Sequence, residues 1–123
     1  MNIIIAGNGK VGATLTRLLS AEGHNITLVD TNARVLERSQ EQYDVMSVHG
    51  NCAAMDTLLQ AGVKDADLLI AATNADEMNL LCCTTAHGLN PKLHTIARIR
   101  NPEYTAQIYK MRNIYGLSML INP

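Results

Sequence analysis

Short apolar segments alternate with longer segments of mixed polarity along the whole chain. The short segments lie at residues 2–6, 25–29, 45–48, 67–72, 94–98 and 117–121. The segment at 67–72 has the continuous apolar character of a strand that is covered on both faces. Strands that alternate with helices, joined by right-handed crossovers, predict an α/β fold built on a parallel sheet.

The longer segments carry the periodicity and the end signals of helices. In the first of them, apolar residues fall at the i, i+4, i+7 and i+8 positions of one helix face: Val11, Leu15, Leu18 and Leu19. Gly23 ends this segment, and further helices are predicted near 32–42, 53–61 and 76–87, the last stopping at Gly88. Pro102 opens another helix at a position where proline is tolerated. Together these elements predict a Rossmann-like, doubly wound sheet of six parallel strands in the order 3-2-1-4-5-6, with helices on both faces.

A glycine pattern, Gly7-x-Gly9-x-x-Gly12, follows the first apolar segment directly. In a nucleotide-binding βαβ unit, the first glycine permits the tight turn and the second lets the backbone approach a pyrophosphate. The third glycine lets the helix lie close to the sheet. The N–H groups and the dipole of the following helix would then bind phosphates without a cationic side chain. The pattern alone is a weak signal, but its position between a strand and a helix favours a nucleotide site.

Asp30 ends the second strand, about 20 residues after the glycines, where an acidic residue is expected to accept hydrogen bonds from ribose hydroxyls. A 2′-phosphate beside this carboxylate would be repelled, so NADP is disfavoured and NAD(H) or a simple adenine nucleotide fits better. The alternative is that Asp30 is the N-cap of the helix that begins after Thr31 and Asn32.

The predicted strand order places a crevice at the carboxyl ends of strands one and four. The glycine loop lies on one wall, and Thr73 and Asn74 lie on the other. Asn51, after strand three, could approach the adenine, and Arg98, ending strand five, could reach the phosphates. Lys10 could meet a terminal phosphate or remain solvated.

Each of these residues also has a purely structural alternative. Asn51 after Gly50 is an ordinary turn pair, and the Thr73 and Asn74 side chains could cap the helix that contains Glu77. Arg98 could sit in a surface ion pair with Glu77.

Composition narrows the classes of function. A length of 123 residues indicates one domain, and 47% hydrophobic residues indicate a globular chain. A net charge of -1, without Phe or Trp, argues against nucleic-acid binding. No apolar run is long enough to cross a bilayer, so no direct membrane insertion is expected. Cys52, Cys82 and Cys83 are expected to be reduced cytoplasmic thiols, and no catalytic or metal-ligating set stands out.

Two longer stretches, DADLLIAATNADEMN at 65–79 and IARIRNPEY at 96–104, make the chain similar to a known family when taken with GNGKVG and Asp30. The sequence resembles the N-terminal nucleotide-binding domain (KTN or RCK-N) of Trk-type potassium-uptake regulatory subunits. The resemblance covers essentially the whole chain. Its two stretches are far more specific than the glycines alone.

The resemblance implies a cytoplasmic regulatory subunit, not an enzyme, peripheral on the inner face of the cell membrane. Such a subunit binds NAD(H) or ATP/ADP, forms dimers or rings, and gates an integral membrane potassium transporter or channel. It also implies roles for particular residues: the backbone of Gly7, Asn8, Gly9, Lys10, Val11 and Gly12 as phosphate cradle, Asp30 as ribose ligand, Asn51 and Cys52 near the adenine, Thr73 and Asn74 as opposite wall, and Arg98 as distal contact.

Three departures from the family pattern affect these expectations. Lys10 occupies a position that varies in the family, so the preferred nucleotide stays open. Asn51 stands where Asp is commoner. The chain ends at Pro123, about where the family continues, so residues 1–123 are expected to be one domain of a longer regulator. An NAD-dependent oxidoreductase cofactor domain is the alternative function, although no sequence remains for a substrate pocket. A coenzyme-A or sugar-nucleotide domain is a third possibility.

Overall fold

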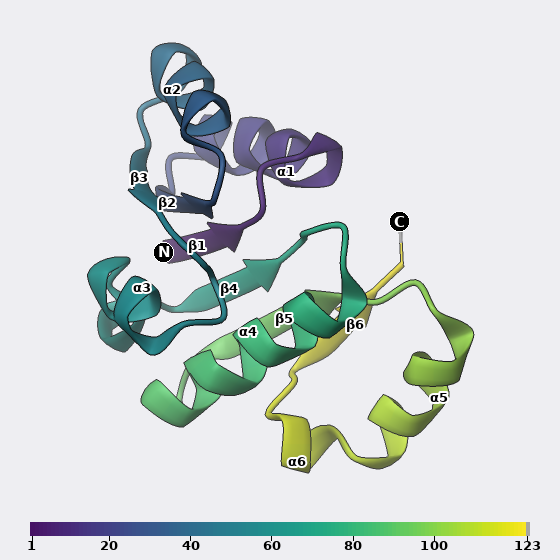
Figure 1. The fold of residues 1–123 in the computed structure, drawn as a ribbon. Helices are drawn as coiled ribbons and strands as arrows, with labels where there is room; N and C mark the ends of the chain where they lie inside the picture. Colours follow the sequence, from purple (N-terminus) through teal and green to yellow (C-terminus); the bar gives the residue numbers. More distant parts are fainter. Residues whose placement is uncertain (123) are drawn as a thin grey trace.

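The computed structural model describes residues 1–122 and shows one parallel sheet of six strands (Figure 1). The strands are β1 (Asn2–Ala6), β2 (Asn25–Asp30), β3 (Met46–His49), β4 (Leu68–Ala71), β5 (His94–Arg98) and β6 (Met119–Ile121). Their order is β3-β2-β1-β4-β5-β6, and every neighbouring pair is parallel. The predicted fold class and strand order are therefore confirmed.

Helices cover both faces of this sheet. They are α1 (Lys10–Ala21), α2 (Ala33–Gln42), α3 (Met55–Gln60), the 3-10 turn η1 (Val63–Asp65), α4 (Asp76–Leu89), α5 (Pro102–Lys110) and α6 (Arg112–Tyr115). In Figure 1, α1 and α2 lie together on one side of the central strands, whereas α3 and α4 lie on the other. At the carboxyl ends of the strands, the loops that follow β1 to β4 and the first turns of α1, α2 and α4 border a cleft.

The central strand β1 shows why a segment of this sheet can be apolar at successive positions. Ile3 and Ile5 are buried in the core between the sheet and α1 and α2. Ile4 and Ala6 point the other way, into the larger core beneath α3 and α4. Because successive side chains of a strand face opposite sides, a strand with two covered faces needs apolar residues at every position.

The predicted end of α4 at Gly88 is wrong, because the helix continues through Gly88 to Leu89. Asn90 follows as its C-cap, and the Asn90 side-chain amide donates to the Val63 carbonyl at 2.9 Å. The helix therefore passes through the glycine and ends before Asn90, which makes this tertiary contact and precedes Pro91. The elements η1 and α6 were not predicted, because three or four residues are too few to show a periodicity. The last strand begins at Met119, two residues later than the apolar run at 117–121.

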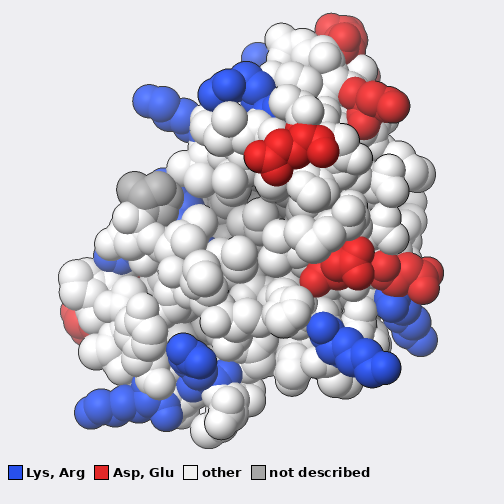
Figure 2. Space-filling view, turned by 180° about the vertical axis from the view of Figure 1, so that it is seen from behind, with Lys and Arg blue, Asp and Glu red and all other residues white. Residues whose placement is uncertain are grey.

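Charged side chains are distributed in small groups. Figure 2 shows small groups of Lys and Arg and of Asp and Glu scattered over the face opposite to that of Figure 1, with broad uncharged surface in the middle and, at the right, acidic and basic side chains next to one another. The chain contains ten Lys and Arg residues and eleven Asp and Glu residues, so positive and negative charges nearly balance. Within residues 1–122, no helix combines the length and apolar character that crossing a bilayer requires.

Candidate nucleotide site

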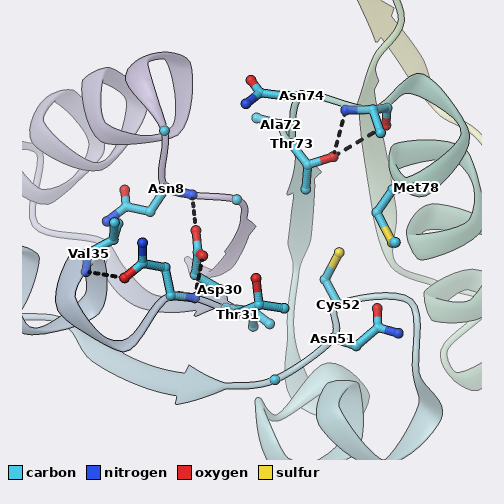
Figure 3. Close-up of a pocket in the computed structure, with 16 residues that line it drawn as sticks. Asn8, Asp30, Thr31, Val35, Asn51, Cys52, Ala72, Thr73, Asn74 and Met78 are labelled. Carbon is cyan, nitrogen blue, oxygen red and sulfur yellow. Dashed lines mark hydrogen bonds between the residues drawn. The ribbon is translucent and has the colours of Figure 1, made fainter.

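A cleft of about 430 Å³ opens at the carboxyl ends of the strands, at the point between β1 and β4 where the strand order reverses (Figure 3). Four loops border it, each following one of the strands β1 to β4. The lining residues are 7–9, 29–32, 50–52 and 72–75 together with Val35 and Met78. Ligands of doubly wound sheets bind at such a switch point, so the cleft lies where the sequence predicted a crevice.

The structure brings eight of the twelve predicted site residues together in this lining. They are Gly7, Asn8, Gly9, Asp30, Asn51, Cys52, Thr73 and Asn74. The other four, Lys10, Val11, Gly12 and Arg98, lie outside it. Lys10 is exposed at the start of α1, whereas Val11 packs against the core under α1 and α2, and Gly12 is buried.

Two of the three glycines are required by the protein itself. Gly7 has φ +90°, and a Cβ on it would lie 2.8 Å from the Thr73 backbone nitrogen. A Cβ on Gly12 would overlap the Gly7 carbonyl oxygen. At Gly9, by contrast, a Cβ would have no neighbour within 4 Å. The missing side chain of Gly9 therefore leaves space in the cleft that a ligand can fill.

The N-terminus of α1 borders this space. Gly9 is the N-cap residue, with no side-chain hydrogen bond to the helix, and the first turn contains no acidic residue. The first N–H groups of an α-helix have no partner within the helix, and the dipole adds positive potential there. Together with the open position at Gly9, the end of this 12-residue helix forms a cradle suited to phosphate oxygens.

Asp30 connects two of the loops that border the cleft. One carboxylate oxygen accepts from the Asn8 N–H at 2.8 Å, and the other accepts from the Asn32 N–H at 2.8 Å. Each oxygen of an ionised carboxylate can accept more than one hydrogen bond, so both retain capacity for ribose hydroxyls. The alternative that Asp30 caps α2 is wrong, because the N-cap is Asn32, which accepts from Arg34 and Val35.

The Asn8 side chain offers a further polar group at the cleft. Asn8 is only 5% exposed, and its Nδ2 donates to the Ser39 hydroxyl on α2. The other polar atom of the amide, Oδ1, is buried and has no hydrogen-bond partner among residues 1–122. A buried polar atom without a partner is unfavourable unless a ligand or a water satisfies it. Among the described residues, the structure therefore leaves this atom unsatisfied at the base of the glycine loop.

The opposite wall is fixed by Asn79, which the sequence reasoning did not single out as a site residue. Asn79 is fully buried on α4, and its Oδ1 accepts from the Thr73 N–H at 2.8 Å and from the Thr73 hydroxyl at 2.6 Å. Its Nδ2 donates to the carbonyls of Thr73 at 3.1 Å and Arg98 at 2.8 Å. One amide thus holds the ends of β4 and β5 together. The signal in the sequence that could have identified Asn79 is a polar residue on the buried face of the predicted helix.

Arg98 lies behind this wall and not in the cleft lining. Its guanidinium donates to the Thr73 carbonyl at 3.3 Å. The alternative of an ion pair between Arg98 and Glu77 is not found within residues 1–122, where Glu77 accepts instead from the Tyr104 hydroxyl at 2.7 Å. The alternative that Thr73 or Asn74 caps α4 is also wrong, since the N-cap residue is Ala75. A contact of Arg98 with a ligand stays a prediction.

Asn51 has both a cleft position and a local role. It is exposed in the lining after β3, and its Oδ1 accepts from the Ala53 N–H at 2.9 Å. This hydrogen bond is typical of a turn, so Asn51 has the structural role that was the alternative to a contact with the adenine. Asn51 therefore lies in the lining next to Cys52 and also shapes the turn after β3.

The contact between Glu77 and Tyr104 predicts a pH dependence of stability. The Tyr104 hydroxyl lowers the pKa of Glu77, and the Glu77 carboxylate raises the pKa of Tyr104. The stabilisation linked to the lowered pKa of Glu77 is present above the pKa of the unfolded carboxyl and is lost as the pH falls through the pKa of the folded one. The stabilisation linked to the raised pKa of Tyr104 is present below the pKa of the unfolded tyrosine and is lost as the pH rises through the pKa of the folded one. Tyr104→Phe is therefore expected to lower the melting temperature most between about pH 5 and pH 9.

Melting curves of the wild type and of Tyr104→Phe across this pH range test the expectation. Tyr109→Phe is the matched control, since Tyr109 is 62% exposed and its hydroxyl has no hydrogen bond within residues 1–122. A melting-temperature difference for Tyr104→Phe that stays constant from acid to alkaline pH would show that this contact does not stabilise the fold.

The chemistry that the cleft can perform follows from its side chains. Its lining contains one carboxylate, Asp30, one thiol, Cys52, and otherwise only amide, hydroxyl and apolar groups. Within residues 1–122, no group of three or more His, Cys, Asp or Glu side chains could hold a metal ion. A phosphate cradle, a ribose acceptor and an apolar floor suit the binding of a nucleotide.

The chain is similar to several known proteins. The TrkA-N domain family matches residues 3–123. The chain is 46% identical over 107 residues to the Trk system potassium uptake protein TrkA of Vibrio alginolyticus, covering 87% of this chain and 23% of that protein. Its identity to the Haemophilus influenzae protein of the same name is 42% over 125 residues, covering 100% of this chain and 27% of that protein. The chain thus spans about a quarter of the length of these relatives.

A solved structure of the Kef CTD of Shewanella denitrificans in an AMP-bound form is also similar. It has a TM-score of 0.83 and 30% sequence identity, and the match covers 100% of this chain and 72% of that one.

Proposed function

Because the chain belongs to the TrkA-N domain family, we propose that it is a nucleotide-binding regulatory domain of a potassium-transport system. The names of its relatives, which are potassium uptake proteins, support the transport context. Since those relatives are about four times as long, the proposal places this domain within a longer regulator. The membrane partner, a potassium transporter or channel, and the location on the cytoplasmic face of the membrane are parts of the same proposal.

The cleft between β1 and β4 is the observation that carries the nucleotide assignment. The phosphates would lie against the N-terminus of α1, in the space that Gly9 leaves open. The ribose hydroxyls would donate to Asp30, and the adenine would lie toward residues 50–52. The AMP-bound state of the similar Kef CTD supports an adenine nucleotide as the class of ligand.

NAD(H) is the first candidate among these ligands, followed by ATP and ADP. All of them carry an adenosine with free ribose hydroxyls and an anionic phosphate chain. NADP is disfavoured, because its 2′-phosphate would lie beside the Asp30 carboxylate and would replace a donor by an anion.

Regulation would follow from different affinities of one nucleotide for two arrangements of a homo-oligomer, a dimer or a ring. A ligand shifts such an equilibrium only by its differential affinity for the two states. Binding without turnover is sufficient for this role. An NAD-dependent oxidoreductase, the alternative, would need an acid or base beside the nicotinamide. The cleft lining offers one carboxylate, Asp30, which already accepts from two backbone N–H groups, and one thiol, Cys52.

Calorimetric titration with NAD, NADH, NADP, ATP, ADP and AMP tests the proposal. Asp30→Asn is expected to weaken NAD, ATP and ADP alike by about tenfold to hundredfold, because hydrogen bonds to a charged group contribute about 1.5–3 kcal/mol. The same substitution should reduce the difference in affinity between NAD and NADP, since it removes the charge that repels the 2′-phosphate of NADP.

Asp44→Asn is the matched control, because Asp44 is exposed and precedes β3, at the opposite end of the sheet from the cleft. It removes the same charge and should leave every affinity unchanged. Wild-type protein that binds none of the six ligands would overturn the proposal, and so would steady turnover of NADH with a carbonyl substrate.

A further inference from the structure

A second cavity lies at the amino ends of β5 and β6, at the opposite end of the sheet from the nucleotide cleft. It has a volume of about 340 Å³ and is bordered by the last turn of α4, the loops that precede β5 and β6, and the start of α6. In Figure 1, α6 lies at the tail of the β6 arrow, whereas the arrows of β1 and β4 point toward the cleft. We call this cavity the basic pocket, after the side chains of His87, Lys92, His94 and Arg112 that line it.

Every titratable side chain in the lining of the basic pocket is of a basic type. Lys92, His94 and Arg112 are exposed, and His87 is half-buried in the last turn of α4. Among residues 1–122, no Asp or Glu contributes to this lining. Because a cavity lined by one sign of charge concentrates ions of the opposite sign, the basic pocket favours an anion.

None of these four side chains is engaged by another part of the described chain. Within residues 1–122, they make no ion pair, and their side-chain nitrogens have no hydrogen-bond partner. By contrast, the Arg100 guanidinium donates to the Asn74 carbonyl at 2.9 Å. The nitrogens of the basic pocket therefore keep their full capacity to donate to a ligand.

An acidic residue beside β5 has its carboxylate turned toward β1 and not toward the basic pocket. This residue is Asp67, whose carbonyl accepts from the His94 N–H at 3.2 Å while its carboxylate accepts from the Asn2 N–H at 2.8 Å. The C-terminal end of α4 adds partial negative charge, and His87 lies in that turn, where a cation is favourable. The basic charge of the pocket is therefore not cancelled by a carboxylate within it.

Ser118 adds a neutral donor to the basic pocket. Its hydroxyl oxygen accepts from the Thr95 N–H at 3.1 Å. The hydroxyl proton has no acceptor within residues 1–122. Since a hydroxyl both accepts and donates, this contact holds the oxygen in place and leaves its proton for a ligand.

The walls of the basic pocket are held by packing. Leu93 and Leu117 in its lining are buried. Gly116 has φ +69°, and a Cβ on it would overlap the His87 ring. The Gly116 carbonyl accepts from the Thr95 hydroxyl at 2.7 Å. The pocket is therefore preformed, and its apolar residues strengthen the attraction between an anion and the donors.

We propose that the basic pocket binds a phosphate group, of a small free compound or of a lipid headgroup, at a site separate from the nucleotide cleft. Arg112 would bind two phosphate oxygens with its planar guanidinium, and Lys92 would neutralise further negative charge. His87, His94 and Ser118 would donate to the remaining oxygens. A phosphate monoester carries a charge of about −1.5 to −2 and three acceptor oxygens. It therefore uses more of these donors than a carboxylate, which has one charge and two oxygens.

Inorganic pyrophosphate is the probe for a free phosphate compound. It is titrated into ¹⁵N-labelled protein at about 0.15 M salt, where long-range attraction between exposed charges is largely screened. We expect saturable shifts of the amide signals of residues 87–94 and 112–118. Their position distinguishes this site from the glycine loop at 7–12, which also suits phosphate oxygens.

Arg112→Gln and Lys92→Gln are each expected to weaken pyrophosphate binding at least about tenfold, because each removes a charged hydrogen-bond donor. Arg38→Gln is the matched control, since Arg38 is exposed on α2 and does not line the basic pocket. It removes the same charge as Arg112→Gln and should leave the affinity unchanged. Melting curves of each variant establish that it is folded before its affinity is compared.

Flotation with lipid vesicles distinguishes the two sources of phosphate. The vesicles contain phosphatidylcholine, alone or with phosphatidic acid, whose headgroup is a phosphate monoester. Association that requires phosphatidic acid, and that Arg112→Gln abolishes and Arg38→Gln does not, would identify a lipid headgroup. Pyrophosphate binding at residues 87–94 and 112–118 without vesicle association would identify a free phosphate compound.

Two results would overturn the proposal. If amide shifts occur only at residues 7–12, or nowhere, and the protein does not float with the vesicles, the basic pocket binds no phosphate. Equal weakening by Arg112→Gln and Arg38→Gln would show that binding follows net charge and not this pocket. Either result leaves the proposed nucleotide function unaffected.

Discussion

Replacing Gly12 by alanine is expected to destabilise the fold by about 3 kcal/mol and to abolish nucleotide binding, although alanine is the better helix former. The added methyl group would overlap the Gly7 carbonyl oxygen. Neither backbone can yield easily, because Gly7 is itself held against Thr73 and its N–H donates to the Val29 carbonyl at 2.8 Å. The displaced turn would no longer present Gly9 and the start of α1 to a ligand.

Gly88→Ala is the matched control for this prediction. Gly88 also lies within a helix, but a Cβ there would have no neighbour within 4 Å. This substitution should stabilise the protein by about 0.5 kcal/mol through helix propensity alone. Urea unfolding of both variants gives the two free energies. Equal stabilisation of both would mean that α1 does not approach the glycine turn as closely as the structure shows.

Replacing Asn79 by alanine is expected to destabilise the fold by about 3 kcal/mol, because it removes four hydrogen bonds from a fully buried site. The carbonyls of Thr73 and Arg98 would lose their shared donor, and the Thr73 N–H would lose its acceptor. Because Thr73 lines the cleft, nucleotide affinity should fall together with stability.

Asn113→Ala is the control for Asn79, since Asn113 is exposed on α6. It should change the free energy of unfolding by less than about 0.5 kcal/mol. Asn79→Asp provides a second comparison, because it keeps the acceptor for Thr73 and loses only the donors. A stability of Asn79→Ala close to that of Asn113→Ala would show that the ends of β4 and β5 are held by other contacts.

The position of the cleft could be predicted because topology determines it. Alternating strands and helices predict a parallel sheet of known strand order, and that order determines the point at which successive strands are added on the other side of the first strand. Gly7, Asp30 and Thr73 are far apart in sequence, but each lies at or just after the carboxyl end of a strand that borders the cleft. Their convergence needed no knowledge of side-chain contacts.

The direction of individual side chains could not be predicted in this way. Arg98 ends a strand at the correct edge, yet its guanidinium turns behind the wall to the Thr73 carbonyl. The alternative partner weighed for Arg98 was Glu77, but Glu77 accepts from the Tyr104 hydroxyl, which α5 brings beside the start of α4. Such choices depend on the packing of neighbouring helices, which the pattern along the chain does not specify.

The amide of Asn79 illustrates a different difficulty. Its residue type is as typical of a helix cap or a surface as of a core, and only the buried face of α4 distinguishes these positions.

The close approach of Gly7 to Thr73 has a mechanical consequence. Beneath the cleft, the main chains of the two halves of the sheet are in direct contact, so the halves cannot close around a ligand by a hinge motion. A conformational change caused by a nucleotide would instead begin in the loops and helix ends that border the cleft.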